Sequence, residues 1–141
     1  MRLLVEFEGA GDAREVSGGG EALVAFMSFA VSRGFGATHP LIALADRLHD
    51  VHHVRLGPLT TFYDADVEDA EDAEKREMSW QPAADLDRAL AGIEAALAND
   101  EQCAQLLRRA DAETLPAEVA SLRCLLASAP PGSRVRLGYR L

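Results

Sequence analysis

Residues 2–8, RLLVEFE, and residues 134–141, RVRLGYRL, carry the clearest structural pattern in the sequence. In both stretches apolar residues alternate with polar ones, and a period of two predicts β-strands with one buried face. The predicted buried residues are Leu3, Val5, Phe7, Val135, Leu137, Tyr139 and Leu141.

The other faces of the two predicted strands carry charges of opposite sign. Glu6 and Glu8 belong to the first strand, and Arg134, Arg136 and Arg140 belong to the last. A cross-strand pair of opposite charges stabilises a sheet by a few tenths to about 1 kcal/mol. We therefore expect the two ends of the chain to pair within one sheet.

Most of the chain between these strands has helical patterns. Apolar residues recur three and four positions apart over residues 21–33, 40–49, 83–98, 100–110 and 115–127, which predicts amphipathic helices. We expect residues 9–20 to form a flexible connecting segment. We expect the helix that begins at residue 21 to end at residues 34–36. Expected helix caps are Thr38 or His39, Asn99 or Asp100, and Thr114. Residues 53–56, closed by Gly57-Pro58, are expected to form a short third strand.

The sequence thus predicts an α+β fold, a single domain over residues 1–141 with five or six helices and a small sheet. Its composition, 48% apolar and 26% charged, is that of a globular protein. No apolar run approaches the roughly 18 residues that a membrane span needs, and the acidic, alternating start does not resemble a signal peptide. We therefore expect a cytoplasmic protein without membrane association. The Arg-rich, Ala-rich composition suggests a bacterial source.

The net charge, the positions of the cysteines and the absence of known motifs argue against several classes of function. A net charge of −9 argues against nucleic-acid binding, which needs a basic face. Cys103 and Cys124 fit no CxxC motif and are expected to be buried, reduced thiols. The sequence contains no GxSxG or SxxK serine-nucleophile motif. The glycines at residues 18–20 lack the P-loop pattern, so a connector is the favoured interpretation.

The strongest local feature is an acidic block over residues 64–77. It holds eight carboxylates against Lys75 and Arg76, a local balance of −6 within the total of −9. One interpretation assigns it no specific function: it is a solvated helix face or loop that keeps the protein soluble. Its functional interpretation is a docking surface for a basic protein, because clustered carboxylates steer association. The residues proposed for this surface are Tyr63, Asp64, Asp66, Glu68, Asp69, Glu71, Asp72 and Trp80.

A second candidate site is the histidine cluster His49, Asp50, His52 and His53. Imidazole with carboxylate suits zinc, iron or manganese, so a small metal-dependent enzyme or metal sensor is the alternative function. The spacing also fits histidines that interact favourably with the C-terminal end of a helix.

The favoured function is a non-catalytic binding protein without a cofactor. Immunity proteins, which neutralise toxins, and inhibitors of basic proteins are examples of this role.

Overall fold

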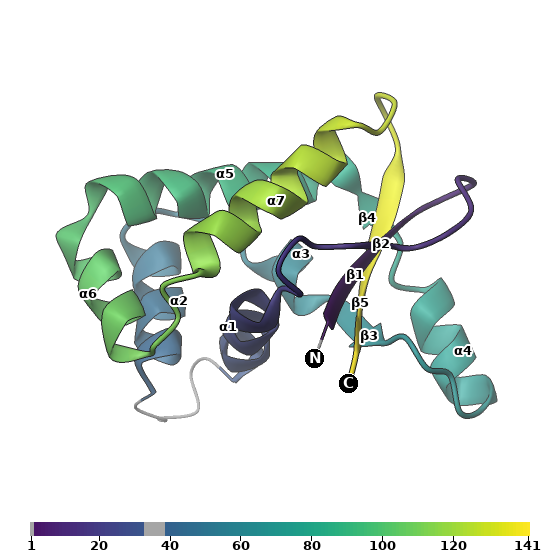
Figure 1. The fold of residues 1–141 in the computed structure, drawn as a ribbon, viewed down its shortest axis with the longest axis horizontal. Helices are drawn as coiled ribbons and strands as arrows, with labels where there is room; N and C mark the ends of the chain where they lie inside the picture. The colour runs from purple at the N-terminus through teal and green to yellow at the C-terminus, as the bar shows by residue number, and fades with distance from the viewer. Residues whose placement is uncertain (1, 33–38) are drawn as a thin grey trace.

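The two terminal strands pair with each other, as the alternating pattern predicts. The structure, a computed structural model, describes residues 2–32 and 39–141. Strands β1 (Arg2–Phe7) and β5 (Arg134–Arg140) are antiparallel neighbours, with Val5 opposite Leu137 and Glu6 opposite Arg136. The chain ends therefore lie side by side in Figure 1.

Three short strands complete a mixed sheet with the order β2-β1-β5-β3. Strand β2 (Arg14–Glu15) pairs antiparallel with β1, β3 (Phe62–Asp64) pairs parallel with β5, and β4 (Gln81–Pro82) pairs antiparallel with β5. The stretch 9–20, which we expected to be flexible throughout, therefore contributes a strand. Strand β5 is central, since it is hydrogen-bonded to β1, β3 and β4.

Seven helices occur in the part of the chain that the structure describes. They are α1 (Glu21–Val31), α2 (Pro40–Asp50), α3 (Gly57–Thr60), α4 (Ala70–Glu77), α5 (Ala83–Asn99), α6 (Glu101–Arg109) and α7 (Leu115–Ala127). Figure 1 shows the five longer helices gathered on one side of the sheet and α4 on the other. Within the helical layer α1 packs on α2, α2 on α6, and α5 on α7. The α+β architecture is thus the predicted one.

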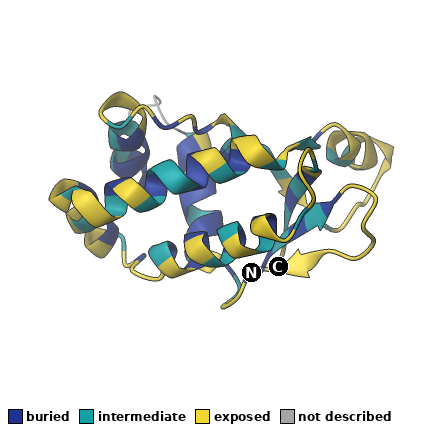
Figure 2. Ribbon diagram, turned by 90° about the horizontal axis from the view of Figure 1, so that it is seen from above, coloured by how far each residue is buried: buried dark blue, intermediate teal, exposed yellow. Residues whose placement is uncertain are grey.

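The core lies between the helical layer and one face of the sheet. Leu3, Val5, Val135 and Leu137 are buried there, and Figure 2 shows dark blue, buried stripes on the helix faces that meet it. Two expectations for the core are wrong. Leu141 follows the last ladder residue and is 85% exposed. Cys124 is exposed, although Cys103 is buried as expected.

The expected strand at residues 53–56 does not form. The amide of Val54 donates to the carbonyl of Leu48, so the chain folds back over the end of α2. His53 reverses the chain with a φ of 55°, a left-handed value that few non-glycine residues adopt. Gly57-Pro58, expected to close a strand, starts α3 instead, because proline suits the first turn of a helix.

Side chains from neighbouring and distant segments cap the helices. His39 caps α2, since its Nδ1 accepts a hydrogen bond from the amide of Leu41 at 3.1 Å. Asp100 likewise accepts from the amide of Gln102 and caps α6. Thr114 stands before α7 but makes no capping hydrogen bond to its backbone. The expected helix stop at residues 34–36 and the alternative cap Thr38 lie outside the described residues.

A buried carboxylate replaces the missing cap of α1. The residue before this helix is Gly20, which has no side chain to offer. Glu118 on α7 is buried, and its Oε1 accepts a hydrogen bond from the amide of Leu23 at 3.0 Å. Its Oε2 accepts from the Thr114 hydroxyl at 2.6 Å. The protein's own carboxylate therefore interacts with the positive end of the α1 dipole, where a glycine-rich loop could otherwise hold an external anion.

Candidate functional site

Helix α4 stands apart from the rest of the molecule. It has no buried residue, in contrast to every other helix of the described chain. Figure 1 shows it projecting beyond the sheet, on the side away from the helical layer. The acidic residues of this region, which we call the acidic surface, are Asp64, Asp66, Glu68, Asp69, Glu71, Asp72, Glu74 and Glu77.

Local interactions explain why so polar a segment is helical. Asp69 is the N-cap, and its side chain accepts a hydrogen bond from the amide of Asp72 at 2.9 Å. Glu71 and Asp72 occupy the first turn, whereas Lys75 and Arg76 occupy the last. Both placements complement the helix dipole. The order of charges thus stabilises a helix that buries no apolar face.

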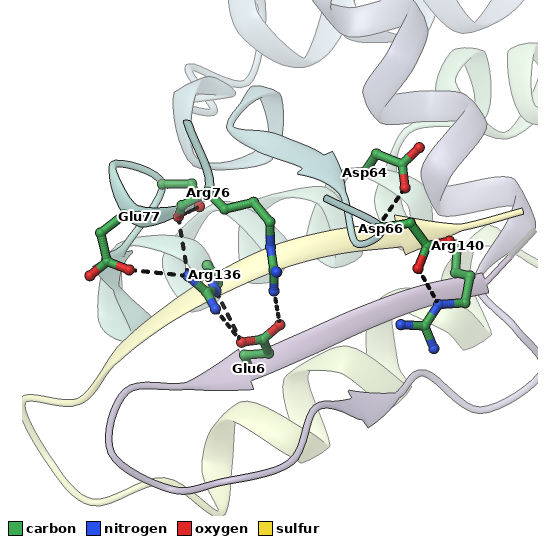
Figure 3. A network of polar contacts seen from close by, with 8 residues as sticks. Glu6, Asp64, Asp66, Arg76, Glu77, Arg136 and Arg140 are labelled. Carbon is green, nitrogen blue, oxygen red and sulfur yellow. Dashed lines mark hydrogen bonds and ion pairs between the residues drawn. The ribbon is translucent and has the colours of Figure 1, made fainter. Parts of the chain in front are cut away.

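An ion-pair network on the polar face of the sheet fixes the position of α4. Figure 3 shows Glu6 of β1 between two arginines. Its Oε1 accepts from Arg76 of α4 at 2.7 Å, and its Oε2 accepts from Arg136 of β5 at 2.7 Å. Arg136 also donates to the main-chain oxygen of Arg76 at 3.3 Å. All three side chains are a quarter exposed or less, so solvent screens this network less than it screens a surface pair.

The segment before α4 has its own link to the sheet. Asp64, at the end of β3, accepts a hydrogen bond from the amide of Asp66 at 2.9 Å. The carboxylate of Asp66 in turn contacts Arg140 of β5 at 3.3 Å, as Figure 3 shows. The acidic surface is therefore held at both its ends by arginines of the same strand.

Three carboxylates of the acidic surface take no part in this framework. Glu68, Glu71 and Glu74 are exposed. None of the hydrogen bonds or ion pairs between described residues joins them to the sheet, and the partner of Glu71 is Lys75 on α4 itself. These three carboxylates are directed to solvent from a segment of fixed position.

The two aromatic residues of the predicted surface are in different surroundings. Tyr63 on β3 is 37% exposed. Trp80 is half-buried, and the guanidinium of Arg136 lies 4.4 Å from its ring centroid. Tyr63 is accordingly available for contact, whereas Trp80 supports the arginine that holds Glu6.

Two further exposed apolar residues were not among those predicted from the sequence for the docking surface. Met78 is 77% exposed and Val67 is 41% exposed, and they lie at the two ends of α4. Single apolar residues inside a charge block give no periodic signal, so only the structure shows that they lack a core to join. Methionine and aromatic residues are enriched at protein interfaces.

The structure separates the members of the histidine cluster. His49 contacts the adjacent Asp50 at 2.8 Å, and both are exposed. His52 contacts Asp100, the N-cap residue of α6, at 2.6 Å. The side chain of His53 has no hydrogen bond or ion pair to any described residue. The four residues therefore do not converge on one point.

Only His52 belongs to a group of potential metal ligands. Among the described residues, His52, Asp100 and Cys103 place one ligand atom each within 4.8 Å of one another. Arg47, however, donates to the same Oδ2 of Asp100 at 2.7 Å. This guanidinium already supplies the positive charge that a metal ion would bring, so the cluster fits a link between α2 and α6 better than it fits a metal centre.

The pKa values of Asp100 and Cys103 agree with a structural link between α2 and α6. Hydrogen bonds from Arg47 and His52 hold the pKa of Asp100 well below its usual range. Burial, together with the charge of Asp100, raises the pKa of the Cys103 thiol to about 11. A thiol with so high a pKa is a poor nucleophile at neutral pH.

Comparison with known proteins identifies no relative of this chain. No model of a protein family, no curated protein and no solved structure matches it. Among the described residues, no helix is long and apolar enough to span a membrane.

Proposed function

We propose that this protein is a non-catalytic binding domain that docks a basic protein on its acidic surface. The observation that carries the proposal is the structural isolation of α4. A helix of eight residues that buries nothing is marginal on its own, yet here arginines from the sheet fix its position. The arrangement presents Glu68, Glu71 and Glu74 to solvent.

The surroundings of the three carboxylates suit a protein partner. Tyr63, Val67 and Met78 supply exposed apolar area beside the charges, and an apolar contact with a charged rim is typical of protein interfaces. The excess of carboxylates would steer a basic partner and repel nucleic acid. A cytoplasmic immunity-type protein or inhibitor is the kind of protein that this proposal describes.

Charge reversal tests the proposal, provided that the carboxylates that cap α4 or contact the sheet are kept. Asp69 caps α4 and Asp66 contacts Arg140, so their replacement would disturb the fold as well as the surface. The test variant is therefore Glu68→Lys/Glu71→Lys/Glu74→Lys. The matched control is Asp12→Lys/Glu101→Lys/Glu113→Lys, three exposed positions elsewhere, and each variant moves the net charge from −9 to −3.

Both variants and the unchanged protein are used to capture proteins from an extract of the source organism. We expect a basic protein to be retained by the unchanged protein and by the control, and to be lost with the test variant. Circular dichroism confirms that all three are folded. Equal retention by the test variant would refute the acidic surface as the docking site.

A further inference from the structure

A second region of the molecule brings imidazole and guanidinium groups together. The segment between α2 and α3 carries His52, His53 and Arg55 in a protein whose net charge is −9. It lines a hollow of about 350 Å³, whose other lining residues include Asp85, Arg88 and Ala89 of α5. Small-molecule sites typically occupy roughly 300–1,000 Å³, so the size suits a small ligand.

Arg55 is one of two exposed arginines, with Arg109, whose side chains have no hydrogen bond or ion pair to any described residue. Nine arginines of the described chain form an ion pair with a carboxylate. The exposed Arg55 side chain has no hydrogen bond or ion pair to any described residue, and neither has that of His53 beside it. The guanidinium of Arg55 is therefore accessible to an external anion.

Contacts of Val54 fix the backbone that carries these two side chains. Val54 between them is buried, and its amide bonds the carbonyl of Leu48. Gly92 of α5 lets that helix approach closely, since a Cβ there would lie 3.0 Å from Val54 Cγ2. The left-handed φ of 55° at His53 is the kind of backbone strain that recurs at binding sites. The main chain on this side of the hollow is therefore held by contacts within the protein.

The other residues that line the hollow indicate the chemical class of ligand that it would bind. Val54, Pro58 and Ala89 provide apolar wall, and Arg88 adds a second guanidinium that is shared with Asp85 at 3.3 Å. We propose that this hollow binds a small molecule with an oxyanion group, a phosphate or a carboxylate, held by Arg55 and Arg88 with an apolar body against Val54 and Pro58. Guanidinium groups recognise both oxyanions through paired hydrogen bonds. The site is independent of the acidic surface.

The test is a titration followed by two-dimensional ¹H–¹⁵N NMR. Phenyl phosphate and benzoate are the two anionic probes, which distinguish phosphate from carboxylate, and benzyl alcohol is the neutral probe. We expect saturable shifts at the amides of residues 53–55 and 88–92 with at least one anion, at a Kd of about 1 mM or tighter, and none with benzyl alcohol.

Two matched variants decide whether Arg55 is responsible. Arg55→Gln should weaken binding at least about fivefold. Arg109→Gln removes the other exposed arginine that lacks a partner among the described residues. This control should bind with a Kd within about twofold of that of the unchanged protein, a difference no larger than experimental scatter. Absence of saturable shifts with either anion up to about 20 mM, or equal weakening by both variants, would overturn the proposal.

Discussion

At the scale of single residues, two carboxylates connect segments that lie far apart in the chain. Glu118 caps α1 from a helix nearly a hundred positions away, and Glu6 holds both Arg76 and Arg136. Nothing in the local sequence around Glu118 indicates that role, because a carboxylate within an amphipathic helix normally lies in solvent. By contrast, His39 and Asp100 cap the helices that follow them, and such local caps were predictable from the sequence.

Gly20 gives the sharpest prediction at this scale. Its φ is 75°, and a Cβ there would lie 2.7 Å from Leu3 Cβ. We expect Gly20→Ala to lower the free energy of unfolding by about 2–4 kcal/mol, through backbone strain and overpacking. Gly18 has a φ of 82° but open space around it, so Gly18→Ala should cost only about 1–2 kcal/mol. Urea unfolding of the two variants measures the difference, and equal costs would show that the contact with Leu3 is unimportant.

At the scale of elements, the terminal strands were predictable and the short elements were not. The period-two pattern and the opposite charges of β1 and β5 specify both their pairing and their buried face. Strands β2, β3 and β4 have two or three residues each, too few to show a period. Their formation depends on the edges that β1 and β5 offer, and residues 53–56 had the more strand-like sequence.

Deletion of residues 134–141 tests the central place of β5. This strand is the hydrogen-bonded neighbour of β1, β3 and β4 and contributes the buried residues Val135 and Leu137. We expect the shortened chain to lose its cooperative thermal unfolding transition and its dispersed NMR spectrum. Deletion of Leu141 alone, an exposed residue beyond the strand, serves as the control and should leave both intact. A folded protein without β5 would contradict this topology.

At the scale of the whole molecule, the charges divide into three arrangements. Carboxylates gather on α4, the guanidinium of Arg55 lies unpaired between α2 and α3, and the shared carboxylate of Asp100 joins α2 to the start of α6. The sequence indicated the first as a run of acids. The sequence also indicated the histidine region as a candidate site. The partner of His52, however, is Asp100, some fifty residues away, and a contact at that separation cannot be predicted from local residue spacing.

The link between α2 and α6 predicts how stability depends on pH. Arg47 and His52 hold the pKa of Asp100 below its usual range, so this carboxylate binds protons more weakly in the folded state. Its contribution to stability is present above the usual carboxyl pKa of about 4 and is lost as the pH falls below it. Asp100→Asn keeps a good helix cap but removes the charge.

Urea unfolding at several pH values between about 7 and 2 measures this contribution. The Asp100→Asn protein should be less stable than the unchanged protein at neutral pH, and its stability should fall less on acidification. Asp12→Asn, a change at an exposed carboxylate, is the control and should follow the unchanged protein. Parallel pH profiles for all three proteins would contradict a stabilising role for the Asp100 charge.

The affinity for the captured partner shows whether the acidic surface binds a basic protein. Isothermal titration at about 50 and 300 mM NaCl compares the unchanged protein, the Glu68→Lys/Glu71→Lys/Glu74→Lys variant and the control of equal charge. We predict that the test variant binds at least about tenfold more weakly at low salt, that the control stays within about threefold, and that salt weakens the remaining complexes. Equal affinities for the test variant and the control would contradict the claim.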